Sequence, residues 1–285
     1  MSLDPRLIPA RPDLAAAHLD AVVAAERFVV GTRRRVAVPA APVRRAPSSG
    51  APLDTEALLG ETVMVYEDDA EGWSWGQLDR DSYVGYLPTE ALAREGPEPT
   101  HKVRAPRTFV YPGPDMKLPP LEALALGCRV TVHGEKAGFA LTGRGAIFAA
   151  HLAPIGTREP DFVTVAGRFL ETPYLWGGRS AFGLDCSGLV QTALTACGIA
   201  APRDSDQQEA ILGTAISLDA PFRRGDLLFW PGHVAIVETP DLLLHANAFH
   251  MAVAREPLAD ALARIGASGT FLRSARRLAS LADAL

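Results

Sequence analysis

The sequence has few cysteines and no long apolar run. Its 285 residues include three cysteines, which are too few for a disulfide framework, and their odd number leaves at least one free thiol. That usage fits a reducing compartment. No stretch reaches the roughly eighteen apolar residues of a membrane-spanning helix. The first residues carry charge and proline in place of an apolar core with a cleavage site. We therefore expect no secretion signal and a cytoplasmic protein.

The sequence also lacks a strong excess of charge of one sign. Lys and Arg number 28 against 33 Asp and Glu, which gives a formal net charge of −5. Nothing in this balance points to nucleic acid or an anionic membrane as a partner. Hydrophobic residues make up 48% of the chain, enough to bury a sizeable core in two or three domains. We expect a soluble globular protein, and the sequence leaves its oligomeric state open.

The pattern of residues changes twice along the chain. Ala-rich and Leu-rich residues 11–27 suggest a helix, which makes residues 1–32 an N-terminal helical extension. From about residue 33 to 155, short alternating segments separated by Gly, Asp and Pro are typical of small β-barrels. After residue 160, a helix capped by Asp161, a second helix and three strand-like runs predict an α+β domain over residues 157–285.

An internal echo divides the β-rich region in two. Leu59-Gly-Glu-Thr-Val63 is echoed by Leu126-Gly-Cys-Arg-Val130. Such self-similarity indicates two copies of one unit. We place the first copy at residues 33–97 and a second, divergent copy at residues 98–156.

The first copy resembles bacterial SH3-like domains. It carries Trp73, Trp75 and a Gly85-Tyr86 pair, and in such domains a Gly-Tyr or Gly-Trp pair closes the barrel. The second copy lacks this pair in its stretch Gly143-Arg-Gly-Ala-Ile-Phe148, so whether it binds anything stays open.

Cys186 stands at the start of a predicted helix. A glycine-containing loop leads into Asp185-Cys186-Ser187, and the residues from Gly188 onward have the pattern of a buried amphipathic helix. The positive end of a helix dipole favours a thiolate, so we expect a depressed pKa for Cys186. Free cysteine is more often a small buried hydrophobe, and we interpret Cys128 and Cys197 in that way. The polar neighbours of Cys186 favour a nucleophile.

Two histidines could complete a catalytic site with this cysteine. His233 begins one strand-like apolar run and His245 ends the next, and neighbouring antiparallel strands could bring their rings together. His233 would then act as the general base for Cys186, and His245 would fix its tautomer. Either could instead be a satisfied core histidine. A zinc site is a rival interpretation, but no Cys-x-x-Cys or His-x-x-x-His spacing accompanies these residues. We expect no metal and no organic cofactor.

Three sequence blocks, in this order, resemble the NlpC/p60 cysteine peptidases, papain-like enzymes that cut cell-wall peptides. The blocks are Asp185-Cys-Ser-Gly188, Gly225-Asp-Leu-Leu-Phe-Trp230 followed by His233-Val-Ala-Ile-Val237, and His245-Ala246. The resemblance covers about residues 160–280. It implies a papain-like fold with Cys186 as the nucleophile, His233 as the base and His245 as the orienting residue. Backbone N–H groups near the helix start would then meet the oxyanion.

The residues around Cys186, His233 and His245 resemble those of a narrower group within this family. This group is the γ-D-glutamyl-L-diamino acid endopeptidases, also called dipeptidyl-peptidases VI. The likeness implies that the partner is a murein-derived peptide, L-Ala-γ-D-Glu-diamino acid, with a free alanine amine, and that the protein recycles such peptides. The bond cut would join γ-D-Glu to the diamino acid. The sequence does not reveal which diamino acid that is.

The resemblance to this group also implies a set of substrate-binding residues. They are Tyr174, Trp176, Asp185, Ser187, Arg203 and Ser205. Tyr174 and Asp185 would hold the substrate amine together with an acidic residue of the first barrel, for which Glu61 is the candidate and Glu56 the substitute. A buried ammonium needs such a carboxylate to compensate its desolvation. The other residues would bind the γ-D-glutamyl carboxylate, with Trp176 as an apolar wall.

Two other functions remain open from the sequence. One is an amidase or acyltransferase on the same papain-like scaffold, acting on another amide or on a lipid ester. The other is a cell-wall-binding module with an inactive catalytic domain, in which the barrels serve adhesion. The intact Cys/His/His set argues against the second.

Overall fold

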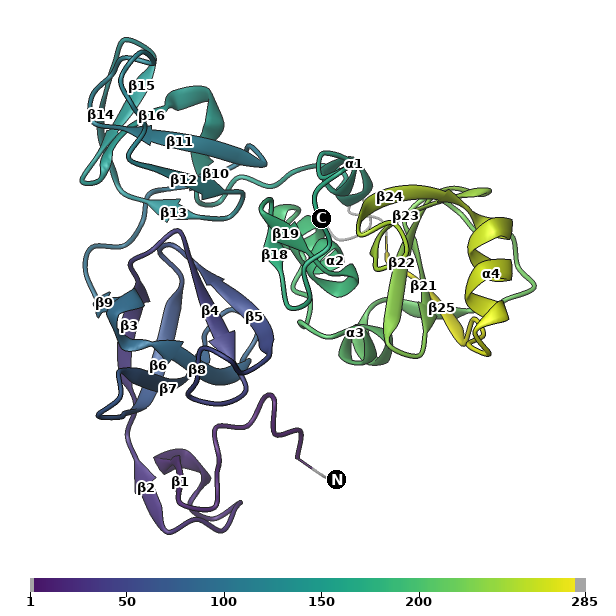
Figure 1. Ribbon diagram of the computed structural model, residues 1–285, viewed down its shortest axis with the longest axis horizontal. Coiled ribbons are helices and arrows are strands. Elements are labelled where there is room, and N and C mark those ends of the chain that lie inside the picture. Colours follow the sequence, from purple (N-terminus) through teal and green to yellow (C-terminus); the bar gives the residue numbers. More distant parts are fainter. Residues whose placement is uncertain (1–2, 280–285) are drawn as a thin grey trace. The chain divides into compact units, whose positions relative to one another are not determined.

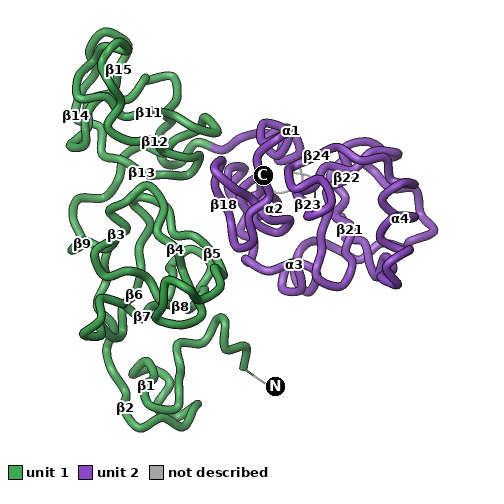
Figure 2. Tube along the Cα trace, in the orientation of Figure 1, with its two compact units in different colours: residues 1–157 green, residues 158–285 purple. Residues whose placement is uncertain are grey.

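The structure is a computed structural model that describes residues 3–279. The chain divides into two compact units, residues 1–157 and residues 158–285 (Figure 2). Within the described residues, the first unit is built of strands and short 3₁₀ turns, whereas the α-helices lie in the second unit. No helix of residues 3–279 combines the length and the apolar character needed to cross a bilayer.

The predicted helix over residues 11–27 is wrong. Strand β1 (Leu14–Ala16) leads into a 3₁₀ turn (Ala17–Leu19) and pairs in parallel with β2 (Arg27–Val29). The N–H of Ala16 donates to the carbonyl of Pro9 at 2.9 Å, and all three residues of β1 are fully buried. Strand pairing satisfies the backbone hydrogen bonds of this segment and burial removes its side chains from water. Together these effects outweigh the intrinsic preference of alanine for a helix.

A seven-stranded antiparallel sheet follows, with a core of its own. Alternate residues such as Val63 and Val65 turn inward to meet Leu78 and Leu87, which is the period of two that the sequence predicted. The strands, in spatial order, are β5 (Leu53–Leu58), β4 (Ala40–Arg44), β8 (Val84–Pro88), β7 (Trp73–Leu78), β6 (Thr62–Asp68), β3 (Thr32–Val36) and β9 (Leu92–Arg94). A 3₁₀ turn (Thr89–Ala91) precedes the last of them.

The remainder of the first unit forms two smaller sheets. One has the order β13 (Arg129–Val130), β10 (His101–Val103), β17 (Leu152–Pro154), and the other has the order β12 (Glu122–Ala125), β11 (Arg107–Tyr111), β16 (Gly145–Phe148), β15 (Phe139–Thr142), β14 (Val132–Lys136). A 3₁₀ turn spans Ala149–His151. Leu58 and Leu59 pack into the core of this region beside Cys128.

The echoed sequences adopt the same local geometry. Gly60 has φ of 80° and Gly127 has φ of 94°, so both echoes turn through a left-handed glycine. The two corners also touch, because Arg129 donates its N–H to the carbonyl of Leu59 at 2.8 Å.

The second unit places helices around a six-stranded antiparallel sheet. Its strand order is β20 (Thr214–Ile216), β25 (Ser274–Arg277), β21 (Asp226–Trp230), β22 (His233–Thr239), β23 (Leu242–Asn247), β24 (Ala252–Pro257). Helix α2 (Cys186–Ala196) packs against β22 and β23, and α4 (Leu258–Ala267) packs against β24. Figure 1 shows α2 and α4 on either side of this sheet. The three strand-like runs predicted from the sequence are therefore neighbours.

Shorter elements lead into α2. Helix α1 (Phe162–Gly167) is capped as predicted, because the Asp161 carboxylate accepts the N–H groups of Val163 and Thr164 at 3.1 and 3.2 Å. Two short strands, β18 (Arg179–Ser180) and β19 (Gly183–Leu184), form a hairpin directly before α2. Helix α3 (Ser205–Ile211) follows.

Candidate active site

Cys186 is the first residue of α2, as predicted. Asp185 caps the helix by accepting the N–H of Gly188 at 2.7 Å. The side chain of Cys186 is buried, and its sulfur accepts a hydrogen bond from the backbone N–H of Val234. The nucleophile candidate therefore lies beside the start of β22, where His233 is the first residue.

The expected depression of the Cys186 pKa is wrong. Burial first, and the charge of Asp185 second, raise the pKa of the Cys186 thiol to about 12. The N–H of Val234 and the charge of Arg203 act in the opposite direction but more weakly. A helix end contributes at most about 2 kcal/mol, and here the loss of solvation outweighs it. Cys186 therefore rests as a thiol and depends on a neighbouring base.

The structure brings the two predicted histidines together. Strands β22 and β23 pair antiparallel with Ile236 opposite Leu244, and Nε2 of His233 lies 2.9 Å from Nδ1 of His245. Burial, and next the proximity of His245, lower the pKa of His233 to about 3, and burial lowers the pKa of His245 to about 4. Both rings are therefore neutral near pH 7. His233 directly precedes Val234, whose N–H binds the sulfur of Cys186. A neutral imidazole at this position is chemically suited to act as the base for the thiol.

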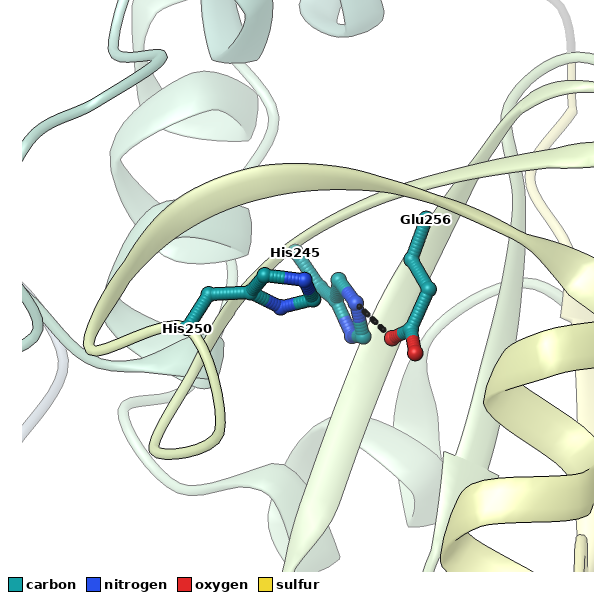
Figure 3. Close-up of side chains that lie close together, drawn as sticks. All are labelled: His245, His250 and Glu256. Carbon is teal, nitrogen blue, oxygen red and sulfur yellow. Dashed lines mark hydrogen bonds and ion pairs between the residues drawn. The ribbon is translucent and has the colours of Figure 1, made fainter.

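Sequence reasoning missed Glu256, which continues this chain of side chains. Its Oε2 lies 3.0 Å from Nε2 of His245 (Figure 3). Strand β24 pairs with β23 so that Glu256 is opposite Leu243, two residues before His245 and on the same face. The side chain is 5% exposed. In the sequence, Arg255-Glu256 has the pattern of a solvated surface pair, so no signal marked it.

Arg264 of α4 holds the Glu256 carboxylate. Its Nε and Nη2 donate to the two carboxylate oxygens at 2.8 and 2.7 Å. These bonds keep the pKa of Glu256 below its usual value, so the group is an anion that can only accept hydrogen bonds. The phenyl ring of Phe249 lies 4.6 Å from the guanidinium carbon of Arg264, which fixes the position of the cation from its other side.

One group of side chains in the described part of the chain has donor types that could hold a metal. The ligand atoms of His245, His250 and Glu256 lie within 4.8 Å of one another (Figure 3). Glu256, however, already accepts from the Arg264 guanidinium with both oxygens. A divalent cation would have to displace that cation or lie beside it. The group fits a hydrogen-bonded chain better than a metal centre.

The Asp185 carboxylate is engaged on both oxygens. Oδ1 accepts from Nη1 of Arg203 at 3.0 Å and from the N–H of Gly188 at 2.7 Å. Oδ2 accepts from Nη2 of Arg203 at 2.6 Å and from the N–H of Gly177 at 2.9 Å. One carboxylate thus ties the helix start to the glycine turn that precedes it.

Arg203 is 1% exposed and completes this network. Besides Asp185, it donates to the hydroxyl of Ser187 at 2.9 Å and to the carbonyl of Gly178 at 3.3 Å. Three of the predicted substrate-binding residues therefore contact one another directly. A substrate carboxylate could reach Arg203 only by displacing one of these bonds.

The other predicted residues of this unit lie on the segments around the nucleophile. Burial first, and the charges of Cys186 and Asp185 next, raise the pKa of Tyr174, which places its hydroxyl close to both groups. Trp176 is 64% exposed. Ser205 is the half-buried first residue of α3.

Glu61 belongs to the first unit, where it has structural partners. It is 4% exposed, accepts the N–H of Leu58 at 2.9 Å and forms an ion pair with Arg80 at 3.1 Å. Glu56 is a half-buried residue of β5. The contact of either residue with a substrate amine stays a prediction.

Comparison with protein families gives two matches. Residues 43–92 match the bacterial dipeptidyl-peptidase SH3 domain, and residues 171–262 match the NlpC/P60 family. The second match contains Cys186, His233, His245 and Glu256.

Several curated proteins are similar in sequence. The γ-D-glutamyl-L-lysine dipeptidyl-peptidase of Bacillus subtilis is 30% identical over 194 residues, which are 62% of this chain and 64% of the relative. The protein of the same name from Bacillus cereus is 27% identical over 204 residues, or 62% of this chain and 60% of the relative. The probable endopeptidase NlpC of Escherichia coli is 37% identical over 109 residues, or 33% of this chain and 70% of the relative. The chain thus spans less than two thirds of the two dipeptidyl-peptidases.

A solved structure shares the fold over most of the chain. The crystal structure of an NlpC/P60 family protein from Bacillus cereus superposes with a TM-score of 0.72 at 24% identity, and covers 86% of this chain and 99% of that one. The fold is accordingly an SH3-like β region followed by a papain-like α+β domain, in agreement with the resemblance found in the sequence. The chain belongs to the NlpC/P60 family of peptidases and carries a bacterial dipeptidyl-peptidase SH3 domain ahead of the peptidase domain.

Proposed function

We propose that this protein is a cysteine peptidase that hydrolyses the bond between γ-D-Glu and a diamino acid in murein peptides with a free N-terminal L-Ala. The observation that carries the proposal is the 2.9 Å contact of His233 with His245, at the start of the strand whose Val234 N–H binds the sulfur of Cys186. Similarity to proteins named γ-D-glutamyl-L-lysine dipeptidyl-peptidase supports the choice of bond. The requirement for a free amine suits peptides already released from the wall, so we propose a role in their recycling.

The reaction proceeds through an acyl-enzyme. Nδ1 of His233 takes the thiol proton of Cys186 as the sulfur attacks the carbonyl carbon of the γ-glutamyl amide. Backbone N–H groups at the start of α2 stabilise the negative oxygen of the tetrahedral intermediate. The imidazolium of His233 then gives its proton to the leaving amine, and the C–N bond breaks. Water, deprotonated by His233, hydrolyses the thioester and restores the thiol.

Substrate selection is assigned to the segments beside the nucleophile. Tyr174 and Asp185 would hold the alanine ammonium, joined by Glu61, or by Glu56, of the first barrel. Both oxygens of Asp185 already accept from Arg203, so the ammonium would share this carboxylate with the guanidinium. A buried ammonium needs such a nearby carboxylate. The remaining residues would contact the glutamyl part, namely Ser187, Arg203 and Ser205 at its carboxylate and Trp176 as an apolar wall.

The β-rich part of the chain would limit access to this site. We assign residues 33–97 to a first SH3-like barrel and residues 98–156 to a divergent second copy, ahead of a catalytic domain from residue 157 to 285. The left-handed corners at Gly60 and Gly127 support the duplication. The first barrel would act as a gate that rejects long, glycan-linked stems.

The test is a comparison of free and blocked substrates. We expect release of L-Ala-γ-D-Glu from L-Ala-γ-D-Glu-L-Lys, or from its diaminopimelate counterpart, by the wild-type chain and not by Cys186→Ala. N-acetylation removes the positive charge and two hydrogen-bond donors of the amine, at a cost of about 1–3 kcal/mol, so kcat/KM should fall by about 5-fold to 160-fold. Equal rates on both substrates would overturn the gate. A wild-type protein that cleaves neither peptide would favour an amidase or acyltransferase acting on another substrate.

A further inference from the structure

Glu256, His245 and His233 are joined by two hydrogen bonds. The donor-to-acceptor direction of these bonds decides which nitrogen of His233 can act as a base. We propose that Glu256, held by Arg264, sets the tautomers of both histidines so that Nδ1 of His233 is left unprotonated for Cys186. Glu256 is thus a positioning residue of the peptidase domain. The proposal rests on the proposed function only in taking Cys186 as the group that His233 serves.

The positions of the protons follow from the carboxylate of Glu256. Glu256 is an anion and accepts hydrogen bonds only, so the 3.0 Å contact with Nε2 of His245 requires a proton on that nitrogen. A neutral imidazole carries one N–H, and Nδ1 of His245 must therefore be a lone pair. This lone pair lies 2.9 Å from Nε2 of His233, which must donate to it. The single proton of His233 is then on Nε2, and Nδ1 is free to accept.

The surroundings of Glu256 support this order. The charged or titratable groups that face its carboxylate are Arg264, His245 and His250. Arg264 supplies two donors to the carboxylate oxygens, so the direction of these bonds is fixed. The hydrogen bond between Glu256 and His245 then determines the tautomer of His245, and through it the tautomer of His233.

Loss of the acceptor at this position would leave the two tautomers unset. In Glu256→Leu, Nε2 of His245 has no carboxylate to bind, so the proton of this ring can lie on Nδ1. Nδ1 then donates to Nε2 of His233, and the proton of His233 is left on its own Nδ1, where it blocks the transfer from Cys186. Glu256→Gln keeps an acceptor, because Oε2 accepts from both Nη2 of Arg264 and Nε2 of His245 and an amide oxygen at that position can accept from both in the same way.

The chain offers a matched control in Glu238 of β22. This carboxylate is also held by two bonds from one arginine, Arg255, at 2.6 and 2.8 Å. Glu238 is half-buried and Arg255 is exposed. Glu238→Leu therefore removes the same carboxylate from a Glu–Arg pair that has no histidine in its bonds.

The experiment measures tautomers and turnover in the full chain. Long-range ¹H–¹⁵N spectra of ¹⁵N-histidine-labelled protein near pH 7 should show protonated Nε2 on both His233 and His245 in the wild type and in Glu238→Leu. Protonated Nδ1 should be present on both rings in Glu256→Leu. Peptide hydrolysis should fall in Glu256→Leu, by up to the roughly 10²-fold to 10⁴-fold that a general base contributes, and stay within about threefold in Glu238→Leu. Glu256→Gln and Glu256→Asp, which keep an acceptor, should retain the wild-type tautomers and recover part of the rate.

The wild-type spectrum alone can overturn the proposal. Protonated Nδ1 on either histidine of the wild type would refute it, even where Glu256→Leu fails to fold. So would wild-type tautomers and full turnover in Glu256→Leu. Correct tautomers in a wild-type protein that hydrolyses no murein peptide would instead refute the proposed function and leave the role of Glu256 intact.

Discussion

Arg203 and Asp185 form a bidentate ion pair with N–O distances of 2.6 and 3.0 Å, at exposed fractions of 1% and 8%. Asp185 directly precedes the nucleophile candidate in the chain. The two charges were removed from water together, so neither can lose its partner without a large penalty. This pair therefore couples the stability of the second unit to the geometry of its helix start.

Replacing Arg203 by Met should destabilise the protein strongly. The substitution leaves the Asp185 charge buried without its guanidinium, for which we expect a loss of about 3–5 kcal/mol in the free energy of unfolding. Urea titration monitored by tryptophan fluorescence measures it. Arg224→Met is the matched control, because Arg224 pairs with Asp161 at the surface and should cost less than about 1 kcal/mol. Equal losses in the two variants would contradict this interpretation.

Folding stability should decrease between pH 6.5 and pH 4. Burial lowers the pKa of His233 to about 3 and that of His245 to about 4, whereas an unfolded histidine titrates near 6.5. In this range the unfolded chain binds more protons, so acid favours unfolding. The slope is at most about 1.4 kcal/mol per pH unit for each histidine.

Urea titrations at pH steps from 7.5 to 4.5 measure this dependence. The slope should become shallower in His245→Asn and remain unchanged in His133→Asn, which removes an exposed histidine. A stability that is constant from pH 6.5 to 4.5 would show that these histidines are not buried in their neutral form.

Cys186 should react with iodoacetamide as a thiol of raised pKa. Burial and Asp185 raise the pKa of Cys186 to about 12, and the thiolate is the reactive species. The rate of modification should therefore rise by about tenfold per pH unit from pH 7 to 9. Mass spectrometry of the peptide that contains Cys186 measures this rate, and Cys186→Ala reports any reaction at Cys128 and Cys197. A rate independent of pH would instead indicate a preformed thiolate–imidazolium pair.

Gly60→Ala should destabilise the first unit more than Gly72→Ala does. Both glycines have positive φ, 80° and 90°, so each substitution costs about 1–2 kcal/mol of backbone strain. A Cβ at position 60 would also lie 2.6 Å from the carbonyl oxygen of Arg129, whereas one at position 72 meets nothing within 4 Å. We expect Gly60→Ala to lower the melting temperature clearly further in a thermal unfolding experiment. Equal shifts in melting temperature would mean that the backbone around Gly60 and Arg129 can move to accept a Cβ without loss of stability.

Local signals predicted the parts of the site that depend on neighbours in sequence. Cys186 begins its helix and Asp161 caps the preceding one, as predicted, because a short carboxylate before a helix accepts its first N–H groups. His233 and His245 meet because the runs that contain them have the alternation of paired strands. In both cases the relevant contact is encoded within a few residues or one strand pairing.

The sequence predictions failed where residues far apart in the chain determine the local structure or the pKa. Residues 11–27 have a helical composition, but β2 and the carbonyl of Pro9 provide a strand with its partners. The pKa of Cys186 follows from burial, which its position at a helix start does not reveal. Glu256 became recognisable only once α4 placed Arg264 beside it.

The shared carboxylate of Asp185 has a consequence for redesign of the enzyme. Because it binds Arg203, the turn at Gly177 and the first turn of α2 at once, a mutation meant to alter substrate preference there would also shift the nucleophile. Laboratory evolution toward a new substrate should therefore begin at Trp176, which is 64% exposed and lies outside this network. Changes at positions 185 and 203 should survive selection only as compensating pairs.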